Sequence, residues 1–111
     1  MSDRQRLPCL GPDAIRAALA ERAPAWRVHD GALVREYRFA DFATAFAFMG
    51  EVAAAAELHD HHPDWRNRYA RVEIAWRTHD SGGITDLDVA MAARCDELAA
   101  PYPSRPSHAD H

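Results

Sequence analysis

Three histidines, His59, His61 and His62, fall within four residues of one another in the segment HDHHPDW, and Pro63 follows directly. A fourth ring, His79, comes shortly after the segment YARVEIAW. Imidazole titrates near neutral pH, so these rings can either bind a metal ion or transfer protons. The pattern therefore poses a choice between a metal site, an acid–base site and a solvated helix end.

Each alternative accounts for part of the pattern. A metal site would use three nitrogen donors, with oxygen ligands from Glu57, Asp60 or Asp64. Adjacent histidines normally diverge, however, and a proline behind them stiffens the backbone, which disfavours that arrangement. The dipole of a helix favours histidine at its C-terminus, which explains one or two of the rings without requiring His79. Acid–base catalysis explains the set, because a reaction that loses water needs one group to donate a proton and another to accept one.

Asp88 is a candidate carboxylate for orienting one of these rings. It ends the segment Thr85-Asp86-Leu87-Asp88, which has the spacing of a helix capping box with Asp in place of the usual Glu. Capping the helix and orienting a ring are compatible roles for one carboxylate.

The elements that position these residues follow from hydrophobic periodicity and turn signals. A helix opens at Gly11-Pro12 and ends at Ala23-Pro24, and Asp30-Gly31 indicates a tight hairpin. Asp41 caps a long helix that runs to about Leu58. A half-buried strand then carries Val72, Ile74 and Trp76, and a last helix begins near Thr85. We predict an α+β fold, an antiparallel four-stranded sheet with helices packed on one face.

The long helix carries its apolar residues at helical spacing, which predicts a buried stripe. Phe48 lies outside that stripe, so we expect it to mark a second face that could meet a partner. The residues of the stripe are Phe42, Ala45, Phe46, Met49, Val52, Ala53 and Ala56.

The 111 residues fit one domain. We predict a loose lead-in over residues 1–10, a single domain over 11–100 and a disordered tail over 101–111. The net charge of −4 gives no basic face for nucleic acid, and no apolar run is long enough to span a membrane. Two isolated cysteines and a start without a signal peptide favour a soluble cytoplasmic protein.

The segment ELHDHHPDWRNRYARVEIAWRTHDSGGITDLD closely resembles the signature of the pterin-4a-carbinolamine dehydratases. That signature combines an acidic residue, His-His-Pro, an aromatic residue, a later histidine and an aspartate. The resemblance extends over about residues 12–99. The matching positions are Glu57, His61, His62, Pro63, Tyr69, His79 and Asp88.

The resemblance implies a dehydratase that converts 4a-hydroxytetrahydropterin to quinonoid dihydropterin and water, with pterin as substrate and no metal or other cofactor. His61, His62 and His79 would be catalytic, with His62 protonating the departing hydroxyl. Asp88 would orient His79 or the substrate.

The same resemblance implies that Glu57 and Trp65 shape the pocket and that Pro63 sets the turn, whereas His59 lies outside the signature. It also implies a homodimer or homotetramer. The alternative is a non-catalytic or dual-function binding module, either a transcriptional coactivator or an assembly chaperone with a protein partner.

Overall fold

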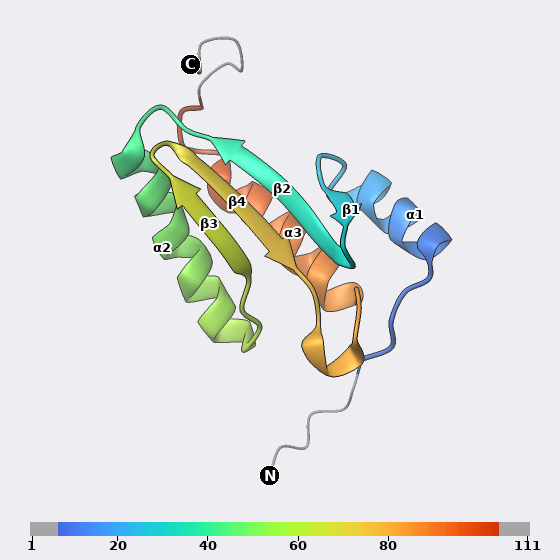
Figure 1. Ribbon diagram of the computed structural model, residues 1–111. Coiled ribbons are helices and arrows are strands. Elements are labelled where there is room, and N and C mark those ends of the chain that lie inside the picture. Colours follow the sequence, from blue (N-terminus) through green and yellow to red (C-terminus); the bar gives the residue numbers. More distant parts are fainter. Residues whose placement is uncertain (1–6, 105–111) are drawn as a thin grey trace.

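A computed structural model of the chain describes residues 7–104. It confirms the predicted α+β fold, with three helices behind one antiparallel sheet (Figure 1). The elements in chain order are α1 (Pro12–Arg22), β1 (Arg27–His29), β2 (Ala32–Arg38), α2 (Phe42–His59), β3 (Asp64–Arg68), β4 (Arg71–Trp76), the 3-10 turn η1 (His79–Ser81) and α3 (Asp86–Ala99).

The sheet consists of two hairpins joined side by side. Its strand order is β1-β2-β4-β3, so β2 and β4 form the centre and β3 lies at an edge. Asp30 and Gly31 both have positive φ, 51° and 75°, as the predicted tight turn between β1 and β2 requires. The last strand of the second hairpin, β4, runs directly into the segment that carries His79.

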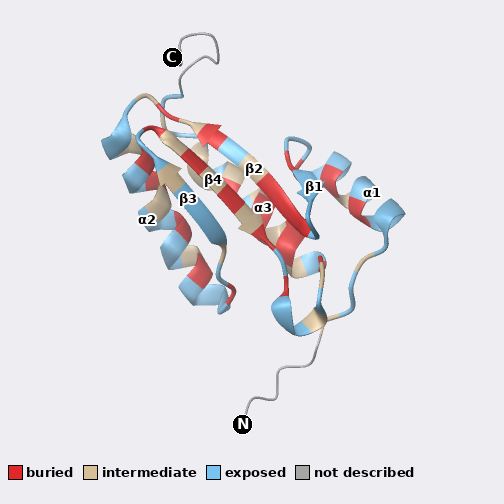
Figure 2. Cartoon of the chain, in the orientation of Figure 1, coloured by how far each residue is buried: buried red, intermediate tan, exposed pale blue. Residues whose placement is uncertain are grey.

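The core fills the space between the sheet and the helices, and Figure 2 shows the buried residues along β2, β4 and the inner sides of the helices. Register explains the pattern, because paired residues on neighbouring strands share a face. Leu33 pairs with Trp76 and Tyr37 pairs with Val72, and all four are buried against the helices.

Helix α2 begins as predicted but turns a different face to the core. The Asp41 side chain accepts a hydrogen bond from the amide of Thr44, which caps the helix. Phe48 is fully buried, whereas Phe46 is 61% exposed and stacks on the exposed ring of Phe42. The prediction that Phe46 belongs to the buried stripe and Phe48 lies outside it was therefore wrong. Small alanines fit either side of the helix, so the sequence pattern did not determine which face of α2 meets the core.

Both ends of the described chain pack against the domain. The Leu10 amide donates to the Ile84 carbonyl, and Tyr102 packs edge-on to Phe39 and donates its hydroxyl to Glu51. The described parts of the predicted lead-in and tail, residues 7–10 and 101–104, are thus held in place. The rest of both, residues 1–6 and 105–111, lies outside the described residues. Between residues 7 and 104, no helix has both the length and the apolar character needed to cross a membrane.

Candidate active site

The end of α2 separates the two adjacent histidines. Asp60 adopts the left-handed conformation with φ 51° and ψ 45°, and the His61 amide donates to the Ala56 carbonyl at 3.0 Å. This is the hydrogen bond of a Schellman ending, with aspartate in the position that glycine usually takes. The turn sends His61 into the protein, where it is buried, and leaves His62 exposed.

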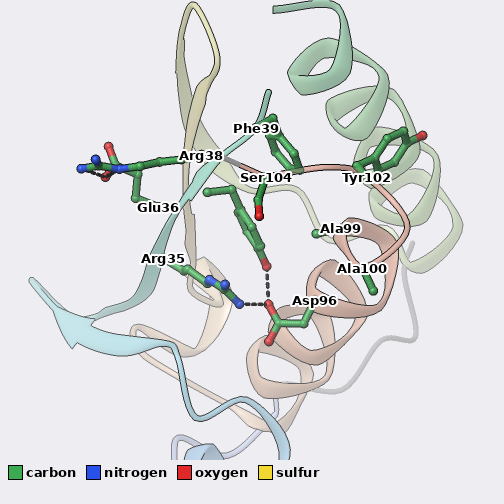
Figure 3. A pocket seen from close by; sticks show the side chains of 10 residues that line it. Arg35, Glu36, Arg38, Phe39, Asp96, Ala99, Ala100, Tyr102 and Ser104 are labelled. Carbon is green, nitrogen blue, oxygen red and sulfur yellow. Dashed lines mark hydrogen bonds and ion pairs between the residues drawn. The ribbon is translucent and has the colours of Figure 1, made fainter. Parts of the chain in front are cut away.

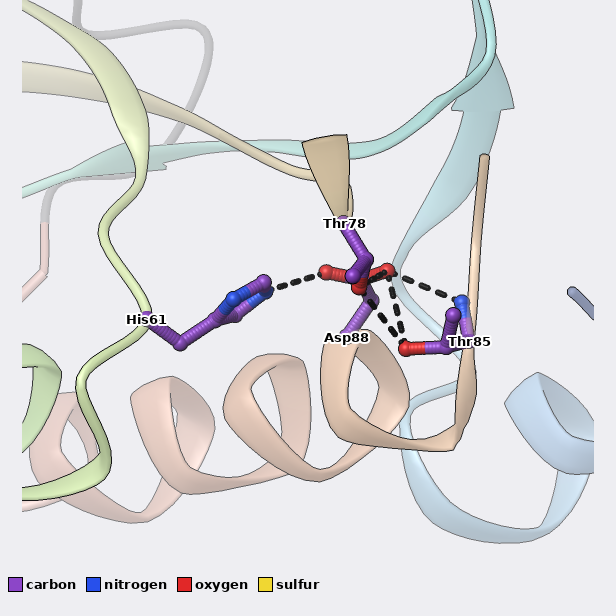
Figure 4. A network of polar contacts seen from close by, with 4 residues as sticks. All are labelled: His61, Thr78, Thr85 and Asp88. Atoms are coloured by element: carbon purple, nitrogen blue, oxygen red, sulfur yellow. Dashed lines mark hydrogen bonds and ion pairs between the residues drawn. The ribbon is translucent and has the colours of Figure 1, made fainter. Parts of the chain in front are cut away.

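His61 pairs with the carboxylate of Asp88. His61 Nε2 lies 2.6 Å from Asp88 Oδ1, and the two side chains are 8% and 0% exposed. Asp88 Oδ2 accepts hydrogen bonds from the Thr78 hydroxyl and the Thr85 amide, both at 2.9 Å (Figure 4). The carboxylate thereby joins the end of α2, the segment after β4 and the start of α3.

This network holds the ring and the carboxylate in a fixed relative position. A buried carboxylate is costly unless it is paired and hydrogen-bonded, and here both of its oxygens have polar partners. An ionised carboxylate only accepts hydrogen bonds, so this pairing suits the His61 tautomer that carries its proton on Nε2. The ring also stacks on Trp76, with centroids 5.5 Å apart and an interplanar angle of 15°. Its orientation is therefore held on two sides.

His62 has a looser carboxylate partner. Its Nε2 lies 2.6 Å from Glu57 Oε2, but the two side chains are 56% and 77% exposed. An exposed ion pair of this kind contributes little to stability, about 0–1 kcal/mol. His62 is thus free to exchange Glu57 for another polar partner.

The three predicted catalytic histidines meet at one cavity of about 280 Å³. His61 and His62 line it from the end of α2, and His79 lines it from η1. Asp88 lies behind His61 and contacts it, whereas the expectation was that Asp88 would orient His79 or the substrate. The residues that line the cavity are Asp60, His61, His62, Pro63, Asp64, Arg77, Thr78, His79 and Asp80.

Two predicted pocket residues are absent from this lining, as far as residues 7–104 define it. Glu57 instead contacts His62. Trp65 pairs with Ile74 across β3 and β4, so it lies on the face of the sheet that the helices cover. The aromatic residue of the signature, Tyr69, occupies the turn between these strands with φ 49°, at the end of the hairpin remote from the histidines.

Sequence reasoning missed Thr78 as a partner of the carboxylate and did not foresee its contact with Thr85. The two hydroxyl oxygens lie 2.8 Å apart, and both residues are buried. The capping-box spacing did predict the Thr85–Asp88 contact, which the structure confirms. Nothing in the local sequence indicated Thr78, because its contact with Asp88 depends on how β4 meets α3. Among the described residues, no group of three or more His, Cys, Asp or Glu side chains is placed to hold a metal ion.

A second polar cluster lies further along α3, at Asp96. Its Oδ1 accepts from Trp26 Nε1 at 3.0 Å, from Arg35 Nη1 at 2.7 Å and from the Tyr37 hydroxyl. Burial, together with the bond to Asp96, raises the pKa of Tyr37 well above its ordinary range. The cluster borders a cavity of about 430 Å³ between β2 and the end of α3 (Figure 3).

The chain is an α+β domain in which the end of one helix and the segment after one strand bring three histidines to one cavity. Comparison with known sequences assigns it to a family. The profile of the family described as pterin 4 alpha carbinolamine dehydratase matches residues 8–98, and the chain belongs to that family.

Individual relatives agree with the profile. A protein of Afipia carboxidovorans is 50% identical over 95 residues, covering 84% of this chain and 94% of the relative. A protein of Solibacter usitatus is 52% identical over 91 residues, covering 82% and 95%. Each is named as a candidate pterin-4-alpha-carbinolamine dehydratase.

Two solved structures are also similar. A transcriptional coactivator/pterin dehydratase from Brucella melitensis matches with a TM-score of 0.78 and 39% identity, covering 82% of this chain and 98% of that one. A pterin dehydratase-like protein, identified as a RuBisCO assembly factor in the alpha-carboxysome, matches with a TM-score of 0.58 and 28% identity, covering 68% and 89%.

Proposed function

We propose that this protein is a 4a-hydroxytetrahydropterin dehydratase, which forms quinonoid dihydropterin and water and so recycles the pterin used in aromatic amino acid hydroxylation. Membership of the family supports the substrate class. The observation that carries the proposal is the buried His61–Asp88 pair at the cavity that His62 and His79 also line.

The reaction requires two proton transfers. The bond between the 4a carbon and its hydroxyl oxygen breaks, and its electron pair leaves with the oxygen. A proton from the enzyme completes the water molecule. The adjacent ring nitrogen loses its proton, and the freed pair forms the carbon–nitrogen double bond. Protein groups that titrate near neutral pH can perform both transfers, so the proposal includes no metal or other cofactor, and pterin is the substrate.

The surroundings of the histidines support a division of roles. Asp88 would stabilise the imidazolium that forms when His61 accepts the proton from the ring nitrogen, as a carboxylate does for the histidine of a catalytic triad. His62, whose exposed partner Glu57 is easily exchanged, would donate the proton to the departing hydroxyl. His79 would bind the substrate from the opposite wall of the cavity, and Pro63 would hold the chain that presents His62.

The test is a direct assay of the purified protein with prepared 4a-hydroxytetrahydropterin, followed by the absorbance of the quinonoid product. We expect the protein to accelerate dehydration, and we expect His62→Ala and His61→Ala each to lower kcat by about 100-fold or more. His59→Ala is the matched control, since this exposed helix-end ring lies outside the cavity lining. A wild-type rate equal to the uncatalysed rate would refute the proposal.

A protein-binding role is the second candidate, either in place of catalysis or beside it. The solved relatives include a coactivator/dehydratase and a RuBisCO assembly factor. The stacked and exposed pair Phe42 and Phe46 offers an apolar surface on α2 for a second copy or another protein.

We propose a homodimer or homotetramer that forms through this surface. We also propose a cytoplasmic location, where the two free thiols Cys9 and Cys95 would stay reduced. Sedimentation of wild-type protein and of Phe46→Ser would test the oligomer, and monomers in both would contradict it.

A further inference from the structure

The segment Leu7–Leu10 lies along the loop that follows η1. Cys9 Sγ donates to the Ser81 carbonyl at 3.0 Å, and the Ser81 hydroxyl donates to the Leu7 carbonyl. The Leu10 amide donates to the Ile84 carbonyl at 2.8 Å. Three hydrogen bonds therefore join this N-terminal segment to residues 81–84, about seventy positions further along the chain.

These bonds reach the loop that Thr78 and Gly83 close, which contains η1 and therefore His79. The Thr78 amide donates to the Gly83 carbonyl at 2.9 Å, and the Gly82 amide donates back to the Thr78 carbonyl at 2.9 Å, which closes the loop at its base. The Thr78 hydroxyl then binds Asp88. The base of the loop is thus held by the Asp88 network and by bonds within the loop, one of them from the Gly82 amide to the His79 carbonyl at 3.1 Å, whereas Leu7–Leu10 supplies contacts from outside the loop.

Close packing connects the segment and the loop at Gly83. A Cβ atom at this position would lie 3.2 Å from Cys9 Sγ, which is tighter than ordinary contact, and 3.9 Å from Cys9 Cβ. Gly83 therefore leaves room for the Cys9 side chain, and a methyl group there would require Cys9 or the loop to shift by a few tenths of an ångström.

We propose that Leu7–Leu10 is a positioning segment for His79, and that Cys9, acting through the Ser81 carbonyl and Gly83, is its main contact. This inference rests on the proposed function, because it assigns His79 to the wall of the catalytic cavity. Cys9 itself is outside the cavity lining, so its effect on the reaction is indirect. Displacement of a catalytic-site group by about 1 Å can lower a rate by as much as about 100-fold.

A pair of substitutions tests the contact. We expect Gly83→Ala to lower kcat by about tenfold with little change in KM, since the added methyl group displaces the loop. Gly83→Ala combined with Cys9→Ala removes the sulfur atom and should restore kcat to the value of Cys9→Ala alone. Gly50→Ala is the control, because its Cβ would meet nothing within 4 Å. An unchanged kcat in Gly83→Ala, or a double variant as slow as Gly83→Ala, would overturn the proposal.

A spectroscopic measurement separates this proposal from the dehydratase activity. The imidazole proton signal of His79, assigned through His79→Gln, should shift in Cys9→Ala, while the signal of exposed His29 in β1 should stay in place. This readout needs neither turnover nor the Gly83→Ala variant to fold. If the wild-type protein lacks dehydratase activity but the His79 signal shifts, the proposed function fails and the positioning role stands. An unshifted His79 signal contradicts the positioning role whatever the activity.

Discussion

Two aspartates on α3 lie eight residues apart in the sequence, and they differ in burial and in the side chains that bind them. Asp88 is fully buried, and its partners are His61 and two threonines. Asp96 is partly exposed, and its Oδ1 is bound by a tryptophan, an arginine and a tyrosine. Both tie distant segments to one helix, but of the two only the Asp88 cluster contains an imidazole, the side chain that proteins most often use for acid–base catalysis.

The difference separates a cluster that the proposed reaction would use from one that it would not. The donors of Asp96 keep their protons at any physiological pH: arginine remains charged, the indole N–H does not titrate, and the pKa of Tyr37 is raised. Such a cluster stabilises the fold without exchanging protons. In the proposed reaction, His61 would accept a proton while Asp88 stabilises the resulting charge, so only the Asp88 cluster would take part in proton transfer. Substitution of Asp88 should therefore lower both kcat and stability, whereas substitution of Asp96 should lower stability alone.

Asp88→Asn should have the largest effect. Without a carboxylate to fix its tautomer and stabilise its imidazolium, His61 loses its role as base, and we expect kcat to fall by about 100-fold or more. Loss of a buried charged partner should also lower the free energy of unfolding by about 2–4 kcal/mol. Urea unfolding and the dehydration assay measure the two changes. Asp86→Asn, exposed in the first turn of the same helix, is the control, and a fully active Asp88→Asn would remove the distinction between the clusters.

Asp96→Asn should lower stability without lowering activity. The change weakens three hydrogen bonds, one of them from a charged arginine, so we expect the free energy of unfolding to fall by about 1–3 kcal/mol. The dehydration rate of the folded variant should match the wild type, because the cluster lies apart from the histidine cavity. Glu97→Gln provides the exposed neighbour for comparison. A selective loss of kcat in Asp96→Asn would show that this cluster also serves the reaction.

Alkaline pH should destabilise the Asp96 end of the helix. Burial raises the pKa of the Cys95 thiol from its ordinary value near 9 to about 12. The unfolded chain therefore ionises this thiol first, and the free energy of unfolding falls as pH rises from about 9 towards 12, by up to about 1.4 kcal/mol per unit for this one group. Thermal unfolding between pH 8 and 11 measures the slope. Cys95→Ala should reduce the slope most clearly between pH 9 and 10, below the ordinary pKa of Tyr37, and an equally steep slope there in that variant would assign the effect elsewhere.

Glu57→Gln should have the smallest effect. Its pair with His62 has the same 2.6 Å separation as the buried pair of His61 but is open to solvent. We expect a change of less than about 0.5 kcal/mol in the free energy of unfolding and a smaller loss of kcat than in Asp88→Asn. Glu21→Gln, exposed on α1, is the control. A loss of stability as large as that of Asp88→Asn would show that burial does not distinguish the two histidine–carboxylate pairs.

Local signals in the sequence predicted most of the fold. The Asp30-Gly31 turn, the Asp41 cap and the alternation of Val72, Ile74 and Trp76 act over a few residues, so short-range rules are sufficient to recognise them. The rotation of α2 was not predictable in this way. Alanine tolerates both core and surface, and the choice between Phe46 and Phe48 depends on the aromatic cluster that Phe48 joins with Tyr37 and Phe39.

The candidate site likewise contains features that the sequence predicted and features that depend on tertiary packing. Residue types and spacing drew attention to the histidine cluster, and the resemblance to the dehydratase signature selected the three histidines that the structure brings to one cavity. The pairing of Asp88 with His61 rather than His79 was not predictable, since it depends on the left-handed turn at Asp60 and on the docking of α2 beside α3. In the second cluster, the partners of Asp96 are separated from it by 59 to 70 positions in the sequence, so no local motif could have predicted these contacts.

The separation of His61 and Asp88 in the chain has a consequence for how the protein folds. The two residues are 27 positions apart, and Thr78 approaches Asp88 across another 10. The His61–Asp88 contact needs one residue from the end of α2 and one from α3, so it forms only after both helices have docked on β4. Loop closure of this length delays such contacts relative to hairpins and single helices. During refolding, the His61–Asp88 pair should therefore form with the cooperative step that docks both helices on the sheet.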